Sequence, residues 1–329
     1  MQEQYLQSLP IWTSDNRHLM KPPLIEIACC DTGLSDTSIN ITESTDDMPS
    51  AFSQLPVLPE IRQEDASAAV ARIYSDIKRA SGTPLVNLIY RHLATIPGGL
   101  EWVWGCIRMN WGYDGLLRAA AAMPTANVTI TLPTSLWHVV GLSDSDLTGI
   151  RALVAQYNLT NAANILGVTA LAHVARNPGC CSNGVMLDWM EVPDGPPITA
   201  ISSVPKLDVL APDTRRLVYF VNGLGEVGQP TMVASLFRQL ALWPSSLAVT
   251  AALLTPLAQS GELTRLRQET IRAAERIAGE LISSPGVGFP PPPQAAREAM
   301  LRALDLFRTT LIAKMLPVGQ ILSQALKPA

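Results

Sequence analysis

The residue types that commonly carry catalysis or metal binding are few in this chain, and their spacing forms no familiar motif. Of the five cysteines, Cys106 stands alone and the others form two adjacent pairs, Cys29–Cys30 and Cys180–Cys181. Neither pair has the C-x-x-C spacing of zinc sites, and the four histidines form no H-x-x-x-H or H-E-x-x-H pattern. The nucleophile elbow G-x-S-x-G is also missing. We therefore expect no metal site, no disulfide framework and no such serine nucleophile.

A glycine-rich motif in the second half of the chain could bind a nucleotide. Gly223, Gly225 and Gly228 form a G-x-G-x-x-G after the β-looking run RLVYFVN, and such a loop can cradle a pyrophosphate at a helix start. A Rossmann site also needs an acid about 20 residues further on for the ribose, yet the next acid after Glu226 is Glu262. No series of parallel strands surrounds the motif. A nucleotide-dependent oxidoreductase is therefore the last of three functional hypotheses.

The composition limits the partners of the protein. The chain has 329 residues, of which 47% are hydrophobic and 16% charged, and its formal net charge is −4. Charged residues make up about 25% of an average soluble protein, so this chain can bury a large core. It has no basic stripe for nucleic acid and no apolar run of the roughly 18 residues that a membrane span needs. We therefore expect no nucleic-acid or membrane partner. Because the start MQEQYLQSLPIW lacks signal-peptide features, we also expect a cytoplasmic protein.

The elements that position any site are predicted to be helices. Residues 1–57 are rich in Ser, Thr, Asp and Pro without sustained periodicity, which predicts a mostly irregular N-terminal extension. From Glu60 onward apolar residues recur at helical spacing, as in AVARIYSDIKRA (69–80). Glycines and prolines such as Gly82, Pro84 and Pro244 separate the helical segments. The run NVTITL (127–132) is the best strand candidate, either as an isolated β segment or as an extended linker.

Two stretches indicate an internal duplication. VNLIYRHLATIPGGL (86–100) and VASLFRQLALWPSSL (233–247) are identical at 6 of 15 positions at an offset of 147 residues. About one identity is expected by chance at ordinary residue frequencies. Upstream, with small gaps, Pro59 aligns with Pro205 and Pro84 with Pro230. Two copies of one helical design usually pack about a pseudo-two-fold axis, and the seam between them is a natural place for a pocket.

The same stretches carry a resemblance to a known family. The run IYSDIKRASGTPLVNLIYRHLATIPGGLEWVW (73–104) resembles the group I 2-haloacid dehalogenases, the DehI family, and so does SLFRQLALWPSSL (235–247) in the second copy. The resemblance covers roughly residues 58–320 and implies an all-α fold of two tandem, pseudo-two-fold-related repeats. We accordingly predict an N-terminal extension (1–57), a first repeat with its connecting loop (58–200) and a second repeat (201–329). The two repeats would form one compact pseudo-dimeric domain.

The family implies a hydrolysis without a covalent ester intermediate, in which an aspartate activates a water that attacks C2 of a small 2-halo acid and expels halide. By position, the implied pocket residues are Leu85, Leu88, Ala234, Ser235 and Leu236. The family's base comes directly after the serine, and Leu236 holds that position here. Leucine cannot take a proton, and no acid lies between Glu226 and Glu262 to replace it. The catalytic base is therefore unknown.

Polar residues near the predicted seam are further pocket candidates. Asn87 and Arg91 are i, i+4 neighbours, and Ser235 and Arg238 are i, i+3 neighbours. Arg91 and Arg238 occur in both copies, which favours a structural role, although arginine is also suited to binding a substrate carboxylate. Asn87 interrupts an apolar stretch, so it needs either a hydrogen bond between helices or a ligand. His92 and Glu101 have structural roles in our interpretation.

The first functional hypothesis is a DehI-like hydrolase of small 2-substituted carboxylic acids that uses no cofactor. The second is a relative without dehalogenase activity, which runs different chemistry or binds a small acid or another protein; the residue at position 236 is its main support. In both cases the expected ligand is a small carboxylic acid. The chain could form a homodimer, but the sequence does not determine the oligomeric state. It also predicts neither the substrate nor its chirality.

Overall fold

The regular elements of the protein are helices, as the sequence predicts. The computed structural model describes residues 58–128, 130, 132–177, 201–226 and 232–327, and these residues contain no strand. The predicted extension 1–57, the two cysteine pairs and Gly228 lie outside the described residues. The helices are α1 (Ala68–Ser81), α2 (Leu88–Leu93), α3 (Gly99–Asn110), α4 (Gly112–Ala120), α5 (Thr134–Val139), α6 (Asp144–Arg176), α7 (Pro212–Gly223), α8 (Ser235–Leu240), α9 (Pro244–Gln259), α10 (Glu262–Ile282), α11 (Arg297–Leu306) and α12 (Ile312–Ala325). Shorter helical turns are η2 (Gln63–Asp65), η4 (Leu207–Val209), η5 (Gln294–Ala296) and the π-helical η6 (Phe307–Leu311).

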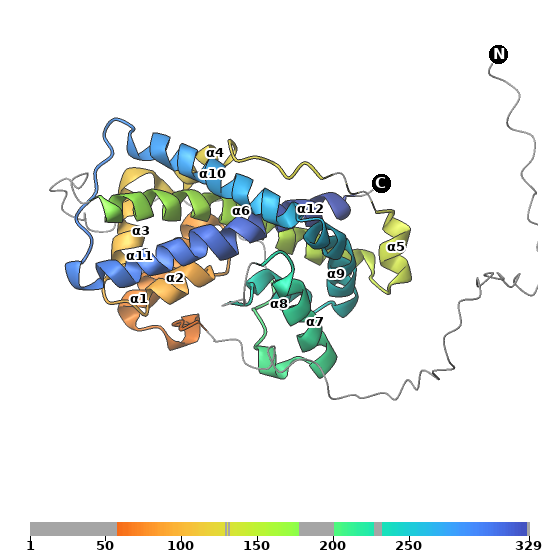
Figure 1. Ribbon diagram of the computed structural model, residues 1–329. Coiled ribbons are helices and arrows are strands. Elements are labelled where there is room, and N and C mark those ends of the chain that lie inside the picture. The colour runs from red at the N-terminus through yellow and green to blue at the C-terminus, as the bar shows by residue number, and fades with distance from the viewer. Residues whose placement is uncertain (1–57, 129, 131, 178–200, 227–231, 328–329) are drawn as a thin grey trace, which may run out of the picture. The chain divides into compact units, whose positions relative to one another are not determined.

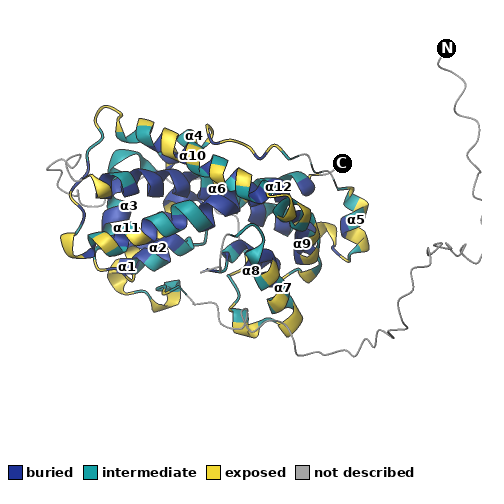
Figure 2. Cartoon of the chain, viewed as in Figure 1, coloured by how far each residue is buried: buried dark blue, intermediate teal, exposed yellow. Residues whose placement is uncertain are grey.

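Helix α6 is the central element of the core (Figures 1 and 2). A capping box begins it, in which the Ser143 side chain accepts from the Asp146 backbone N–H and the Asp146 side chain accepts from the Ser143 backbone N–H. Of its 33 residues, 18 are buried. It packs against α4 and against α10, α11 and α12, which come later in the chain. Residues 160–175 of this helix are buried on nearly every face, so this part of α6 lies inside the helical layers rather than on their surface.

Two segments with strand-like sequences are not strands. The run RLVYFVN lies in α7, where Val218, Val221 and Asn222 are buried at helical spacing. The preference of Val, Tyr and Phe for strands is overridden by this packing. The described residues of 127–132 lie outside helices and strands. The glycine motif therefore begins at the last residue of a helix rather than after a strand, which removes the strand–turn–helix context that a Rossmann site requires.

The helices α2 and α8 have matching positions in the two halves. Each is six residues long, and their first residues, Leu88 and Ser235, are 147 residues apart, the offset of the sequence repeat. Both begin after a residue with a ψ angle of the extended type, 149° at Asn87 and 130° at Ala234. The duplication itself stays a prediction. None of the described helices is both long and apolar enough to cross a bilayer.

Candidate functional site

A small cavity lies where α2 and α8 begin. Its volume is about 40 Å³, whereas one water molecule needs roughly 10–15 Å³ on the same scale. The cavity can therefore hold only a few non-hydrogen atoms as it stands. A larger ligand would enter only if side chains in the wall moved. Its walls come from the starts of α2 and α8, from the middle of α6, and from η6 with α12; they are formed by Asn87, Leu88, Ile89, Tyr157, Asn161, Asn164, Ala234, Ser235, Leu236, Phe307, Leu311, Ile312 and Met315.

Hydrogen bonds hold the two helix starts in place. The Nδ2 of Asn87 donates to Oγ1 of Thr160 on α6 over 3.3 Å. In the second half, Oδ1 of the buried Asn222 accepts from the backbone N–H of Ala234 over 2.9 Å. Its Nδ2 donates to the Met232 carbonyl over 2.8 Å. One side chain from α7 thus fixes the backbone that leads into α8, which positions Ser235 and Leu236 at the cavity.

Helix α6 supplies the polar wall. Tyr157, Asn161 and Asn164 lie at i, i+4 and i+7 and therefore share one face of the helix. The side chain of Asn164 is 1% exposed, and its Oδ1 accepts hydrogen bonds from the hydroxyls of Tyr90 and Tyr113 over 2.9 and 3.4 Å. Its Nδ2 has no hydrogen-bond partner among the described residues. This amide therefore has a buried donor available for a ligand acceptor.

Tyr157 and Ser235 meet at the second-half side of the cavity. The Tyr157 hydroxyl donates to Oε1 of Gln239 over 2.5 Å. Burial raises the pKa of this phenol well above its ordinary value, and the positive charge of Arg91, the Ser235 hydroxyl and the charge of Arg238 act in the opposite direction. Its effect on the pKa of Tyr157 places the Ser235 hydroxyl close to the phenol. The distances and angles at its buried Oγ nevertheless do not meet those of a hydrogen bond with any described residue. It is a second polar group available to a ligand.

The side chains of the cavity wall can form hydrogen bonds, but none of them is suited to accept or give up a proton near neutral pH. The residues that line the cavity include no Asp, Glu, His, Lys, Arg or Cys. Leu236, at the position that the resemblance assigns to the base, is 1% exposed and lines the cavity. Within the described part of the chain, no three His, Cys, Asp or Glu side chains are grouped so that they could hold a metal ion. The site can bind a small molecule through amide and hydroxyl groups, but its described lining offers no general base.

Five of the eight predicted pocket residues meet in this cavity, namely Asn87, Leu88, Ala234, Ser235 and Leu236. The other three, Leu85, Arg91 and Arg238, line a separate depression with Glu60. Arg91 donates from Nε to Glu60 over 2.5 Å and from a terminal nitrogen to the Val86 carbonyl. Arg238 donates twice to the Pro205 carbonyl, over 3.0 and 2.6 Å. Their guanidinium groups bind the segments that precede the helices, and this draws them away from the cavity.

Other residues in and after the first repeated stretch also lie away from the cavity. Nδ1 of His92 lies 2.7 Å from the Pro59 carbonyl, and Glu101 is in the first turn of α3. Trp102 and Trp104 are buried in the core, and the indole N–H of Trp104 donates to Asp76 over 2.7 Å. None of these residues lines the cavity.

The residues that sequence reasoning missed come from α6 and from the junction of α11 and α12. The run NLTNAANILGV places Asn158, Asn161 and Asn164 at helical spacing within an apolar segment, and this signal could have indicated a polar wall. For Phe307 and Leu311 no such signal exists. Both lie in the π-helical η6 and line the cavity, and π-helical turns are frequent at functional sites.

The described residues thus form an all-helical structure with a small cavity at the starts of the two short helices α2 and α8. The chain is similar to a solved structure of a D-2-haloacid dehalogenase mutant, with a TM-score of 0.58, 15% identity, and coverage of 82% of this chain and 96% of that one. It is also similar to such a mutant in complex with D-2-CPA (TM-score 0.57, 16% identity, the same coverage) and to D-2-haloacid dehalogenase with L-LA (TM-score 0.57, 17% identity, the same coverage).

These similarities show that the chain has a DehI-like fold, which confirms the helical fold class that the resemblance implies; the two tandem repeats stay a prediction. No protein-family model matches the chain, and no curated protein matches it by sequence.

Proposed function

We propose that the seam cavity binds a small 2-substituted carboxylic acid. The observation that carries this proposal is that residues 147 positions apart, at the starts of α2 and α8, line one small cavity. The unpartnered donors of Asn164 and Ser235 suit the oxygen atoms of a carboxylate. Arg91 and Arg238 lie outside the cavity, yet their positive charge acts on Tyr157 in its wall. The same field favours an anionic ligand.

We propose further that the natural protein does not hydrolyse such an acid by the aspartate-dependent route. Direct attack of water on C2 requires a group that removes a proton from the water as the halide leaves. Leu236 occupies the position of that group, and the cavity lining contains no carboxylate or imidazole. A relative that binds a small acid without dehalogenating it therefore fits the site best.

Dehalogenase-like hydrolysis is the second candidate function. It is supported by the similarity of the fold to D-2-haloacid dehalogenase, a mutant of which has been solved in complex with D-2-CPA. In this chain it would need a base from outside the described cavity lining.

The experiment that separates the two functions measures binding and turnover on the same protein. We expect saturable heat of binding for racemic 2-chloropropionate, and halide release equal to that of a heat-killed control. Asn161→Leu should abolish binding because it removes a polar group from the cavity wall, whereas Asn127→Leu, the same change at an exposed position, should leave binding unchanged. Absence of binding would contradict the first proposal, and halide release by the natural chain would contradict the second.

Leu236→Asp tests whether the base is the missing group. A carboxylate at this buried position would have its pKa raised towards neutrality by desolvation, which suits a general base. We expect this variant to release halide from 2-chloropropionate at a rate that rises with pH as the carboxyl group loses its proton. Leu236→Asn is the matched control, since it has a similar size and cannot take the proton. If Leu236→Asp binds the acid but stays inert, the base is not the group that hydrolysis lacks.

A further inference from the structure

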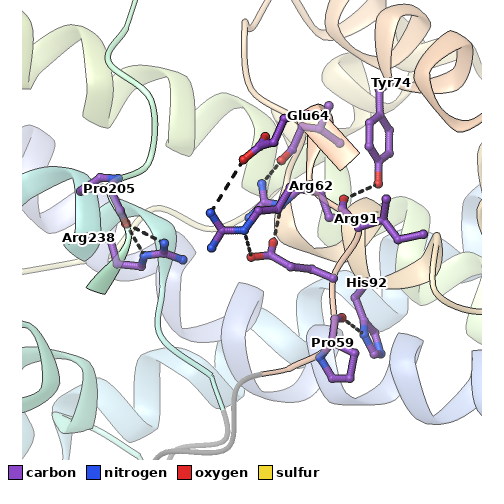
Figure 3. A network of polar contacts seen from close by, with 11 residues as sticks. Pro59, Arg62, Glu64, Tyr74, Arg91, His92, Pro205 and Arg238 are labelled. Atoms are coloured by element: carbon purple, nitrogen blue, oxygen red, sulfur yellow. Dashed lines mark hydrogen bonds and ion pairs between the residues drawn. The ribbon is translucent and has the colours of Figure 1, made fainter. Parts of the chain in front are cut away.

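A second depression of about 300 Å³ lies beside the cavity, between the segments 60–64 and 203–206 and the helices α2 and α8. Four cationic side chains line it, from Arg62, Arg91, Lys206 and Arg238, and two acidic ones, from Glu60 and Glu64. Figure 3 shows Arg62 and Arg238 reaching towards one another from two different segments. The depression therefore has an excess of positive charge in a chain whose formal net charge is −4.

The two buried arginines of this depression are not equally neutralised. Each is the fourth residue of its six-residue helix. Arg91 forms an ion pair with Glu60 over 2.5 Å. Arg238 is 9% exposed, and its hydrogen bonds go to the neutral Pro205 carbonyl. Among the described residues it has no carboxylate within ion-pair distance, although buried arginine is normally paired with an anion.

A single sequence difference explains why Arg238 lacks an acid. In the first half, Pro59 is followed by Glu60, whose carboxylate binds Arg91. In the aligned segment of the second half, Pro205 is followed by Lys206. The position that supplies the acid in one copy thus supplies a cation in the other. Burial lowers the pKa of Arg238, Glu60 raises it, and the neighbouring Arg91 and Arg62 lower it further, so an anion beside this group would be stabilising.

From this arrangement we infer that the depression is a binding site for a small, multiply charged anion, either a phosphate or a dicarboxylate. The planar guanidinium of Arg238 is suited to two parallel hydrogen bonds with such an anion, and Lys206 adds a mobile point charge at the rim. The site is distinct from the seam cavity, whose lining contains none of these charged residues. The inference does not depend on the function proposed for that cavity.

The test measures binding of two probes, inorganic phosphate and succinate, to the full chain by titration calorimetry, with chloride held constant. We expect saturable binding of at least one probe, and the tighter one identifies which anion the site prefers. Lys206→Glu restores the acid found in the first half, so it should pair with Arg238 and weaken binding about tenfold or more. Because Lys206 is exposed, this variant should fold normally.

Arg272→Glu is the matched control, because it reverses the charge of another exposed cation, on α10. It should leave the affinity for both probes within about twofold, because at physiological salt interactions between exposed charges are largely screened beyond about 8 Å. The inference is overturned if neither probe shows saturable binding. It is also overturned if Lys206→Glu binds as tightly as the natural chain, or if Arg272→Glu loses as much affinity as Lys206→Glu.

Discussion

At the scale of single residues, the Ser235 hydroxyl is present at a cost to stability. Its Oγ is buried and has no hydrogen-bond partner of acceptable geometry among the described residues. A buried polar group without a partner destabilises the native state. It lies in the cavity wall, where the ligand that we propose would supply the missing partner.

We therefore predict opposite effects of Ser235→Ala on stability and on binding. The free energy of unfolding should stay the same or rise by up to about 1 kcal/mol, because an unpaired hydroxyl is removed. The affinity for 2-chloropropionate should fall about ten- to a hundredfold, because a hydrogen bond to a charged group is worth about 1.5–3 kcal/mol. Urea unfolding and titration calorimetry measure the two quantities.

Ser81→Ala is the matched control for this prediction. The Ser81 hydroxyl is also buried, but it donates to the Ile77 carbonyl over 2.6 Å and lies away from the cavity. Its removal should lower stability by about 1 kcal/mol and leave binding unchanged. If the two alanine variants behave alike, Ser235 is not the ligand-facing group that its environment indicates.

At the scale of helices, α12 approaches α6 closely at a glycine. Nδ2 of Asn158 on α6 donates to the Gly319 carbonyl over 3.0 Å and to Oγ of Ser323 over 2.9 Å. A Cβ atom on Gly319 would overlap the Oδ1 of Asn158. Since two hydrogen bonds hold the Asn158 side chain in place, it cannot move aside without losing them.

We predict that Gly319→Ala lowers the free energy of unfolding by about 1–3 kcal/mol, as expected for overpacking of a helix contact. The gain in helix propensity is smaller than this cost. Gly279→Ala is the matched control, because Gly279 is also helical and a Cβ atom there meets nothing within 4 Å. It should raise the free energy of unfolding by about 0.5–1 kcal/mol. Equal effects of the two changes in urea unfolding would contradict the close approach.

The helix scale also explains how far the sequence predicts the site. The repeat predicts that Asn87, Leu88, Ser235 and Leu236 share a surface, because equivalent positions of two copies meet at a seam. It cannot predict Asn164 or Phe307, because these residues reach the cavity through packing between distant helices rather than through local spacing. Arg238 was expected near the cavity from its helical phase, but a backbone carbonyl outside the helix determines where its side chain lies.

At the scale of the whole molecule, the two halves share one core. A single hydrophobic cluster contains buried residues from Val70 in α1 to Leu326 at the end of α12. Helix α6 belongs to the predicted first repeat but packs against α10, α11 and α12. Helix α2 packs against α11, and the rings of His92 and Phe307 are 6.0 Å apart. If each repeat were an independent domain, each would bury these faces within itself.

We therefore predict that the described helical region unfolds as one cooperative unit. Differential scanning calorimetry should give a single transition whose calorimetric enthalpy equals its van't Hoff enthalpy, which is the signature of all-or-none unfolding. The segments 58–200 and 201–329, produced separately, should show no cooperative transition, because each exposes the apolar face that the other covers. Two resolved transitions in the intact chain, or cooperative unfolding of either segment alone, would mean that the repeats are separate domains and that the cavity lies at a domain interface.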